Sequence, residues 1–99
     1  MTEPRLILTL LARIPETGIE AFRAYEDGVI PLMGRYGGVL ERRLRTGDGL
    51  VEIHVVSFPD AAAFEAYRAD PERASFAPLL AESGAELELL TVADVEGEH

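Results

Sequence analysis

The sequence predicts an α+β fold in which one four-stranded antiparallel sheet carries two helical regions on one face. Two observations support this prediction: the order strand, helix, strand, strand, helix, strand along the 99 residues, and the turn and capping residues that separate the segments. A chain of this length has room for one domain, which we assign to residues 1–95, with a frayed tail over residues 96–99.

The first half supplies one strand and one helix. Residues 6–14 are rich in Leu and Ile, which predicts a central strand. The segment from Thr17 to Glu20 has the pattern of a capping box, so a helix is expected to begin there. Its apolar side chains recur every three or four residues, and they are Phe22, Tyr25, Val29, Met33 and Tyr36. Pro31 predicts a kink near residue 28, and the Gly37-Gly38 pair predicts the helix end.

The second half begins with a hairpin. Residues 39–46 and 50–58 are strand-like and flank Gly47-Asp48-Gly49, which suits a tight turn between antiparallel strands. Asp60 is expected to cap a helix through residue 69, and Asp70-Pro71 to begin a second helical piece.

The chain ends with a further strand. Gly84 closes the helical region, and the polarity of residues 85–95 alternates as in a strand with one buried face. The complete order is βαββαβ, the ferredoxin-like arrangement, in which both helical regions cover the same face of the sheet. The other face requires a polar surface or a partner.

The third strand suggests how the faces are divided. Val51, Ile53 and Val55 form an apolar row, which we expect beneath the helices, so that Glu52, His54 and Phe58 lie on the open face. Either row of the first strand is apolar enough to be buried, so that strand does not decide between the two faces.

The open face also contains apolar side chains from other strands. Leu90 and Val92 are assigned to it, together with the ionisable Arg43. A monomer rarely leaves a large apolar patch in water. A second copy of the sheet is the expected cover. Two such sheets would form a closed barrel whose interior offers a small-molecule cavity.

Composition excludes several function classes. Eighteen acidic against nine basic residues give a net charge of −9, which repels nucleic acid and anionic membranes. The absence of Cys excludes disulfides, thiol catalysis and thiolate metal sites, and the absence of Lys excludes Schiff-base chemistry. No apolar run is long enough to span a membrane, and the first residues lack the layout of a secretory signal, so we expect a cytoplasmic protein.

Three residues are the candidates for catalysis. His54 is the internal side chain whose ordinary pKa lies near neutrality, which makes it the default general base; its alternative role is a polar residue within an interface. Arg73 lies toward the apolar side of its helix, where its partner is either a substrate carboxylate or enolate, or a protein carboxylate such as Glu52 or Asp70. Tyr67 either holds a phenol or carbonyl oxygen or belongs to the core.

Four further residues are the candidates for substrate contact. Glu52 shares a face with His54 and can orient the imidazole, although an ordinary solvated carboxylate is the alternative. Arg43 is the cavity candidate from the basic cluster Arg42, Arg43 and Arg45, which otherwise protects an edge strand from unwanted pairing. Phe58 and Tyr25 complete the set, and Tyr25 is also explained as a core residue.

The run VEIHVVS and the residues after it resemble the signature segment of the dimeric α+β barrel superfamily. The residues that carry this resemblance are Phe58-Pro59-Asp60, Phe64, Tyr67, Asp70-Pro71, Arg73 and Phe76. The chain is most similar to stress-responsive barrel and polyketide-cyclase-like proteins, to antibiotic biosynthesis monooxygenases, and to a short bacterial family. Gly37-Gly38 and Phe58-Pro59 match the Gly-Gly pair and the Phe-Pro strand end of that short family.

The resemblance implies a homodimer that uses no metal or organic cofactor. Such proteins oxygenate phenols or anthrones with dioxygen, or cyclise and isomerise polyketide or lactone substrates. In cyclase-like members a strand His works with a Tyr and a His around the second helix. Tyr67 matches that Tyr, Arg73 replaces the helix His, and Glu52 occupies the position of the strand His, with His54 one pleat further on.

Two hypotheses follow for the function. The first is a cofactor-free enzyme acting on a small aromatic or polyketide-like molecule, with His54 as base and Arg73 and Tyr67 stabilising oxyanion charge. The second is a non-catalytic barrel that binds a metabolite or serves as a dimerisation module.

Overall fold

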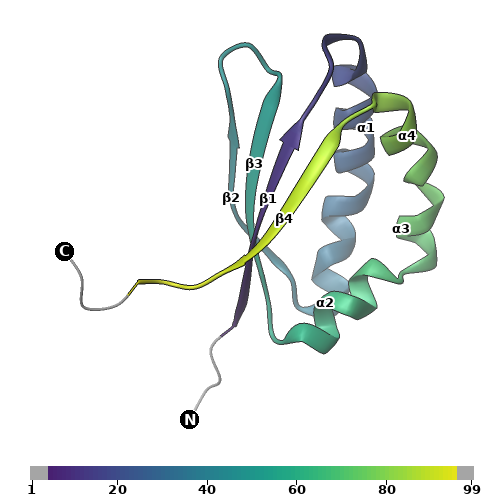
Figure 1. The fold of residues 1–99 in the computed structure, drawn as a ribbon. Helices are drawn as coiled ribbons and strands as arrows, with labels where there is room; N and C mark the ends of the chain where they lie inside the picture. The colour runs from purple at the N-terminus through teal and green to yellow at the C-terminus, as the bar shows by residue number, and fades with distance from the viewer. Residues whose placement is uncertain (1–4, 96–99) are drawn as a thin grey trace.

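The computed structural model describes residues 5–95 and consists of one sheet with helices on one side (Figure 1). The strands are β1 (Leu6–Arg13), β2 (Val39–Arg45), β3 (Val51–Phe58) and β4 (Glu86–Val92). They pair antiparallel in the order β2-β3-β1-β4. This confirms the ferredoxin-like α+β fold class. The predicted tail at residues 96–99 lies outside the described residues.

The helices occupy the intervals between the strands. The first interval contains the 3₁₀ helix η1 (Glu16–Gly18), the helix α1 (Ile19–Val29) and the 3₁₀ helix η2 (Ile30–Tyr36). The second contains the short helices α2 (Ala61–Arg68), α3 (Pro71–Ser75) and α4 (Ala77–Ser83). Over residues 5–95, no helix is both long and apolar enough to cross a bilayer.

The predicted helix starts and the predicted helix end of the second helical region are confirmed. The Asp60 carboxylate accepts the backbone N–H of Ala63, and the Asp70 carboxylate accepts the N–H groups of Glu72 and Arg73. Gly84 ends α4 with a φ of 68°, the left-handed conformation that favours glycine. Pro31 predicted a disturbance of the first helix, and the α-helix gives way to a 3₁₀ helix at Ile30.

The capping box predicted at Thr17 to Glu20 is not formed. A 3₁₀ turn begins directly after Pro15 and uses the hydrogen bond from Gly18 N–H to the Pro15 carbonyl. Gly18 is therefore the residue that precedes α1, and no side chain caps this helix. Thr17 lies within the turn and not at the capping position.

Strand β2 contains a bulge that alternation alone did not predict. Leu40 pairs with Val56 and Arg42 with Val55, so Glu41 is the extra residue. The Ser57 hydroxyl donates to the Glu41 carboxylate at 2.6 Å and holds the bulged residue in place. As a consequence, Leu40 and Arg43 share a face, whereas simple alternation had separated them.

The face assignment of β3 was wrong, and the structure inverts it. Glu52, His54 and Phe58 are almost fully buried beneath the helices, while Val51, Ile53 and Val55 lie on the open face and are only partly buried. A buried glutamate is tolerated there because arginines of β2 neutralise it. In β3 the more apolar row therefore lies on the face that no helix within residues 5–95 covers.

For the edge strand β4, the predicted division of side chains between the two faces was correct. In β4, Glu86, Glu88, Leu90 and Val92 pair with the open-face row of β1, which leaves Leu87 and Leu89 on the helix-covered face. The row of β1 that lies beneath the helices is Leu6, Leu8, Leu10 and Ala12.

Candidate functional site

A pocket of about 270 Å³ lies between the helix-covered face of the sheet and the helices α1, η2, α2 and α3. Most of its wall is apolar, and this part comprises Leu10, Val29, Ile30, Met33, Leu40, Val56, Phe58, Phe64, Leu87 and Leu89. Leu87 and Leu89 are 42% and 45% exposed, so the pocket opens along the edge strand β4. The size and lining suit a small, mainly apolar molecule.

The polar end of the pocket contains a buried carboxyl and a buried imidazole. Glu26 from α1 and His54 from β3 are each only 3% exposed, and both line the pocket. The Glu26 Oε2 atom lies 3.5 Å from His54 Nδ1. Burial raises the pKa of Glu26 to about 7, and burial lowers the pKa of His54 although Glu52 acts in the opposite direction.

Glu52 lies behind His54 and is paired with two arginines. Its Oε1 atom accepts from His54 Nε2 at 2.8 Å and from Arg43 Nε at 2.9 Å, and its Oε2 atom accepts from Arg45 Nε at 2.9 Å. Burial alone would raise the pKa of Glu52, but the donors on Arg43, His54 and Arg45 outweigh it and lower the pKa to about 2. Glu52 is therefore ionised at neutral pH and holds the His54 ring in one orientation.

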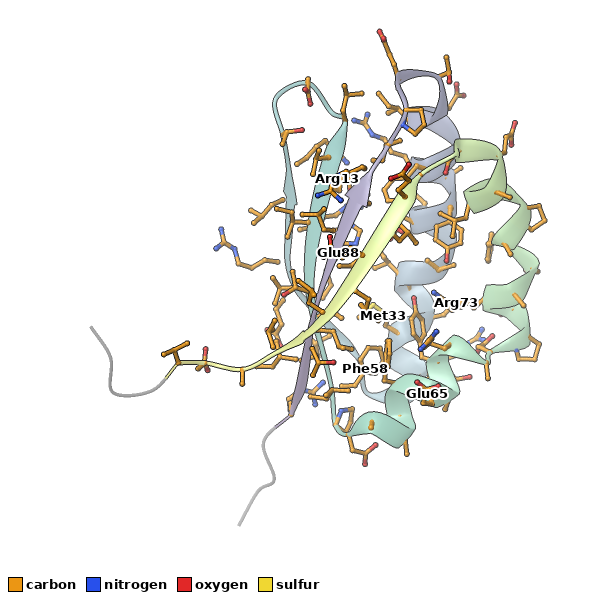
Figure 2. All side chains as sticks on the ribbon, in the orientation of Figure 1. Arg13, Met33, Phe58, Glu65, Arg73 and Glu88 are labelled. Atoms are coloured by element: carbon orange, nitrogen blue, oxygen red, sulfur yellow. The ribbon has the colours of Figure 1, made fainter. Side chains whose placement is uncertain are left out.

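Arg73 supplies positive charge to the same pocket. Its guanidinium carbon lies 4.8 Å from the centre of the Tyr67 ring, and its Nε atom is buried without a hydrogen-bond partner. No carboxylate among residues 5–95 forms an ion pair with Arg73. Figure 2 shows Arg73 on the sheet-facing side of α3, where its charge is available to a ligand.

Two tyrosines flank this cation. The Tyr67 hydroxyl donates to the Val29 carbonyl at 3.2 Å, and burial raises its pKa. Tyr25 also lines the pocket, and burial raises its pKa as well. Both phenols are therefore neutral at physiological pH and can donate hydrogen bonds.

The structure brings the sequence-predicted residues together, but on the other face of the sheet. His54, Arg73, Tyr67, Phe58 and Tyr25 all line the pocket. Glu52 and Arg43 do not line it, because they lie behind His54 and contact the ring or each other. The expected location between two sheets was wrong for this set, because these side chains lie beneath the helices of their own chain.

Sequence reasoning missed Glu26. Its position was informative, since it follows Phe22 by four residues and precedes Val29 by three, on the apolar face of α1. A carboxylate on the apolar face of a helix points into the core. Acidic residues are rarely buried unless a second side chain is paired with them. For metals, residues 5–95 contain no group of three or more His, Asp or Glu side chains arranged to hold an ion.

Comparisons with known proteins identify the fold. No family model matches the chain, and no curated protein matches it by sequence. Among solved structures, SnoaB, a cofactor-independent oxygenase from Streptomyces nogalater, matches with a TM-score of 0.73 at 19% identity, over 97% of this chain and 100% of that one. The chain has the same fold as this oxygenase, which agrees with the resemblance to the dimeric α+β barrel superfamily.

Two other solved structures agree with this fold. A putative antibiotic biosynthesis monooxygenase from Bacteroides thetaiotaomicron matches with a TM-score of 0.78 at 16% identity, over 100% of this chain and 98% of that one. A NIPSNAP domain protein from Burkholderia xenovorans matches with a TM-score of 0.72 at 19% identity, over 95% and 98%. At these identities the shared property is the ferredoxin-like α+β fold of the single chain.

Proposed function

We propose that the protein is a cofactor-independent enzyme that acts on a small aromatic or polyketide-like molecule in the pocket beside β4. One observation supports this most directly: Glu26 and His54, a buried acid–base pair, line the same mainly apolar pocket as Arg73. The Arg73 guanidinium forms no ion pair with a carboxylate of residues 5–95, and its Nε atom has no hydrogen-bond partner there. Such an arrangement can remove a proton from an apolar substrate and stabilise the anion that results.

The chemistry assigned to the site is proton removal followed by reaction of the anion. The Glu26–His54 pair accepts a proton from a phenol O–H or from a C–H beside a carbonyl, and the bonding electrons remain on the substrate as a phenolate or enolate. Arg73 stabilises the negative oxygen, and the Tyr67 hydroxyl does so by exchanging its hydrogen bond to the Val29 carbonyl for one to the substrate. The anion then reacts with dioxygen in an oxygenation, or with a carbonyl of the same molecule in a cyclisation.

We also propose that the protein is a homodimer in which a second copy covers the open face of the sheet. This face presents a continuous apolar row on β3, together with Leu44, Leu90 and Val92, which are 38–47% exposed. Monomers rarely leave a contiguous apolar surface in water, and a second copy of the same face would cover it. The pocket is formed within one chain, so each protomer would contain its own site.

The alternative function is binding without turnover. It is favoured by one observation: both ring nitrogens of His54 already face protein carboxylates, and Glu52 is fully compensated by Arg43 and Arg45. A polar group satisfied in this way can serve packing alone.

A backbone amide NMR titration with phenols, anthrones and lactones, followed in the same samples by mass spectrometry, separates these functions. The enzyme hypothesis predicts shifts at His54, Tyr67 and Arg73, with a product that gains oxygen or loses water. Shifts without any change in mass indicate the binding module. The absence of shifts throughout the panel contradicts both pocket functions.

A matched pair of variants tests the cation. Arg73→Gln is expected to lower the affinity for acidic ligands by roughly tenfold or more, because one charged hydrogen bond contributes about 1.5–3 kcal/mol. Arg42→Gln makes the same change at an exposed arginine on the open face, and is expected to leave ligand affinity unchanged. Equal effects of the two variants would contradict a pocket role for Arg73.

A further inference from the structure

A hydrogen bond between the Glu26 carboxyl and His54 Nδ1 requires one proton between the two groups. Glu52 is an ionised acceptor at 2.8 Å from His54 Nε2, so Nε2 carries a hydrogen and donates it. In the neutral ring, Nδ1 then has only a lone pair, and this lone pair faces the Glu26 carboxyl at 3.5 Å. Two acceptors cannot bond to each other, so a hydrogen bond forms here only when Glu26 or the ring carries an additional proton.

The charges around Glu26 determine where that proton resides. Arg43 on β2 and Arg73 on α3 favour the carboxylate, while Glu52 on β3 and Asp27 on α1 itself oppose it. The neutral phenols of Tyr25 and Tyr67 also lie beside the site, and Arg68 lines the pocket from α2. Burial outweighs these charges and raises the pKa of Glu26 to about 7, whereas burial lowers the pKa of His54. At neutral pH the proton is therefore held by Glu26, and it is readily lost and regained.

Glu26 and His54 differ in how a molecule in the pocket can reach them. Glu26 and His54 both line the cavity, but both ring nitrogens of His54 point at carboxylates and not at free space. The Glu26 carboxyl has no side-chain partner within residues 5–95 apart from the His54 contact. The Glu26 carboxyl is consequently the basic group that a bound molecule can reach.

We propose that Glu26 is the catalytic residue that exchanges a proton with the bound molecule, and that His54 is a positioning residue whose Nδ1 holds the protonated carboxyl. Glu52, with Arg43 and Arg45, fixes the ring so that Nδ1 faces Glu26. This inference rests on the proposed function. In the step itself, a substrate C–H or O–H bond breaks, its electron pair stays on the substrate beside Arg73, and a carboxyl O–H bond forms on Glu26.

Exchange of the acidic C–H hydrogens of anthrone in heavy water, under argon, measures this step without any later reaction. The wild-type protein is expected to introduce deuterium into anthrone, and the rate to rise with pH through a midpoint near neutrality. Glu26→Gln is expected to lower the rate about 100-fold, the usual contribution of a positioned base. Glu20→Gln, the same substitution at an exposed position of α1, is expected to exchange at the wild-type rate.

Two results of this experiment have different meanings. If Glu26→Gln exchanges anthrone as fast as the wild type, the role of Glu26 is wrong while the proposed function survives. If the wild type neither binds nor exchanges anthrone, the proton-transfer chemistry of the proposed function is wrong, and the inference is lost with it.

The positioning role of His54 has a separate readout. Carbon NMR of the glutamate side chains follows the Glu26 carboxyl, identified by its absence in Glu26→Gln. His54→Ala removes the acceptor of the carboxyl proton and is expected to shift the Glu26 midpoint downward by on the order of one pH unit. An unchanged midpoint would overturn the positioning role. Should His54→Ala not fold, a wild-type Glu26 midpoint in the acidic range would by itself overturn the proposal.

Discussion

The raised pKa of Glu26 makes the stability of the folded protein depend on pH. Its pKa rises from 4.5 in an unfolded chain to about 7 in the folded protein, because burial disfavours the carboxylate. Below pH 4.5 both states hold the proton, so nothing is lost. As the pH rises to about 7 the unfolded chain releases its proton first, and the folded state loses relative stability across that window.

Glu26→Gln therefore removes the free-energy cost of burying an ionised carboxylate. We expect this variant to be more stable than the wild type above neutrality, by up to about 3 kcal/mol at roughly 1.4 kcal/mol per unit of pKa shift. In acid the two proteins should be equally stable. Urea unfolding at several pH values measures the difference, and a Glu26→Gln protein that is less stable than the wild type in alkali would show that Glu26 is not a desolvated acid.

Glu52 has the opposite behaviour, because its paired carboxylate stabilises the fold. Glu52→Gln leaves Arg43 and Arg45 without their counter-charge and is expected to cost about 2–4 kcal/mol at neutral pH. The control is Glu88→Gln, which breaks an exposed 3.7 Å pair with Arg13 (Figure 2) and should cost less than about 1 kcal/mol.

The pH window of this effect follows from the pKa of Glu52. That pKa is lowered to about 2 from 4.5, so the stabilisation is present above 4.5 and is lost as the pH falls toward 2. The gap between Glu52→Gln and the wild type should therefore close in acid. A gap that stays constant with pH would indicate a packing defect in place of a lost charge pair.

These charge pairs explain why the face of β3 was predicted incorrectly. Judged alone, the row Val51, Ile53 and Val55 is more apolar than the row that contains Glu52 and His54. Which row faces the helices depends on Arg43 and Arg45, and the bulge at β2 is what places both on the same face as Leu40. A pairing between strands and a one-residue bulge leave no local signal in a single sequence.

At the scale of elements, features encoded within a few residues were predictable. The Asp60 and Asp70 caps, the hairpin and the left-handed helix ends at Gly37 and Gly84 depend on neighbouring residues only, and the structure contains them. The predicted capping box at Thr17 failed because of a distant contact. Gly18 packs against the backbone of Ser83, which brings the start of α1 against the end of α4.

This helix contact predicts a strong effect of a single methyl group. A Cβ on Gly18 would overlap the carbonyl oxygen of Ser83, so Gly18→Ala requires α1 and α4 to separate and should cost about 2 kcal/mol or more. Gly34→Ala, in η2, has no atom within 4 Å of its added Cβ and should be neutral or slightly stabilising. Thermal unfolding compares the two variants, and equal melting temperatures would contradict the tight contact.

At the scale of the whole molecule, the fold places its functional parts on opposite sides of one sheet. All the helices lie on one side of the sheet (Figure 1). The pocket and its charges lie beneath them, and the apolar open face lies on the opposite side of the sheet. β4 belongs to both, since Leu87 and Leu89 line the pocket while Leu90 and Val92 lie on the open face. A partner on the open face would thus contact the same strand that borders the pocket entrance.

The proposed dimer is tested by introducing charge at the centre of the open face. Ile53 is on the interior strand β3, between Leu44 of β2 and Leu11 of β1, so Ile53→Arg would bury an unpaired guanidinium in the interface. We expect the wild type to sediment as a dimer and Ile53→Arg as a monomer. Ala66→Arg adds the same charge at an exposed position of α2 and should remain a dimer. A monomeric wild type at micromolar concentration, or a dimeric Ile53→Arg, would show that another partner covers this face.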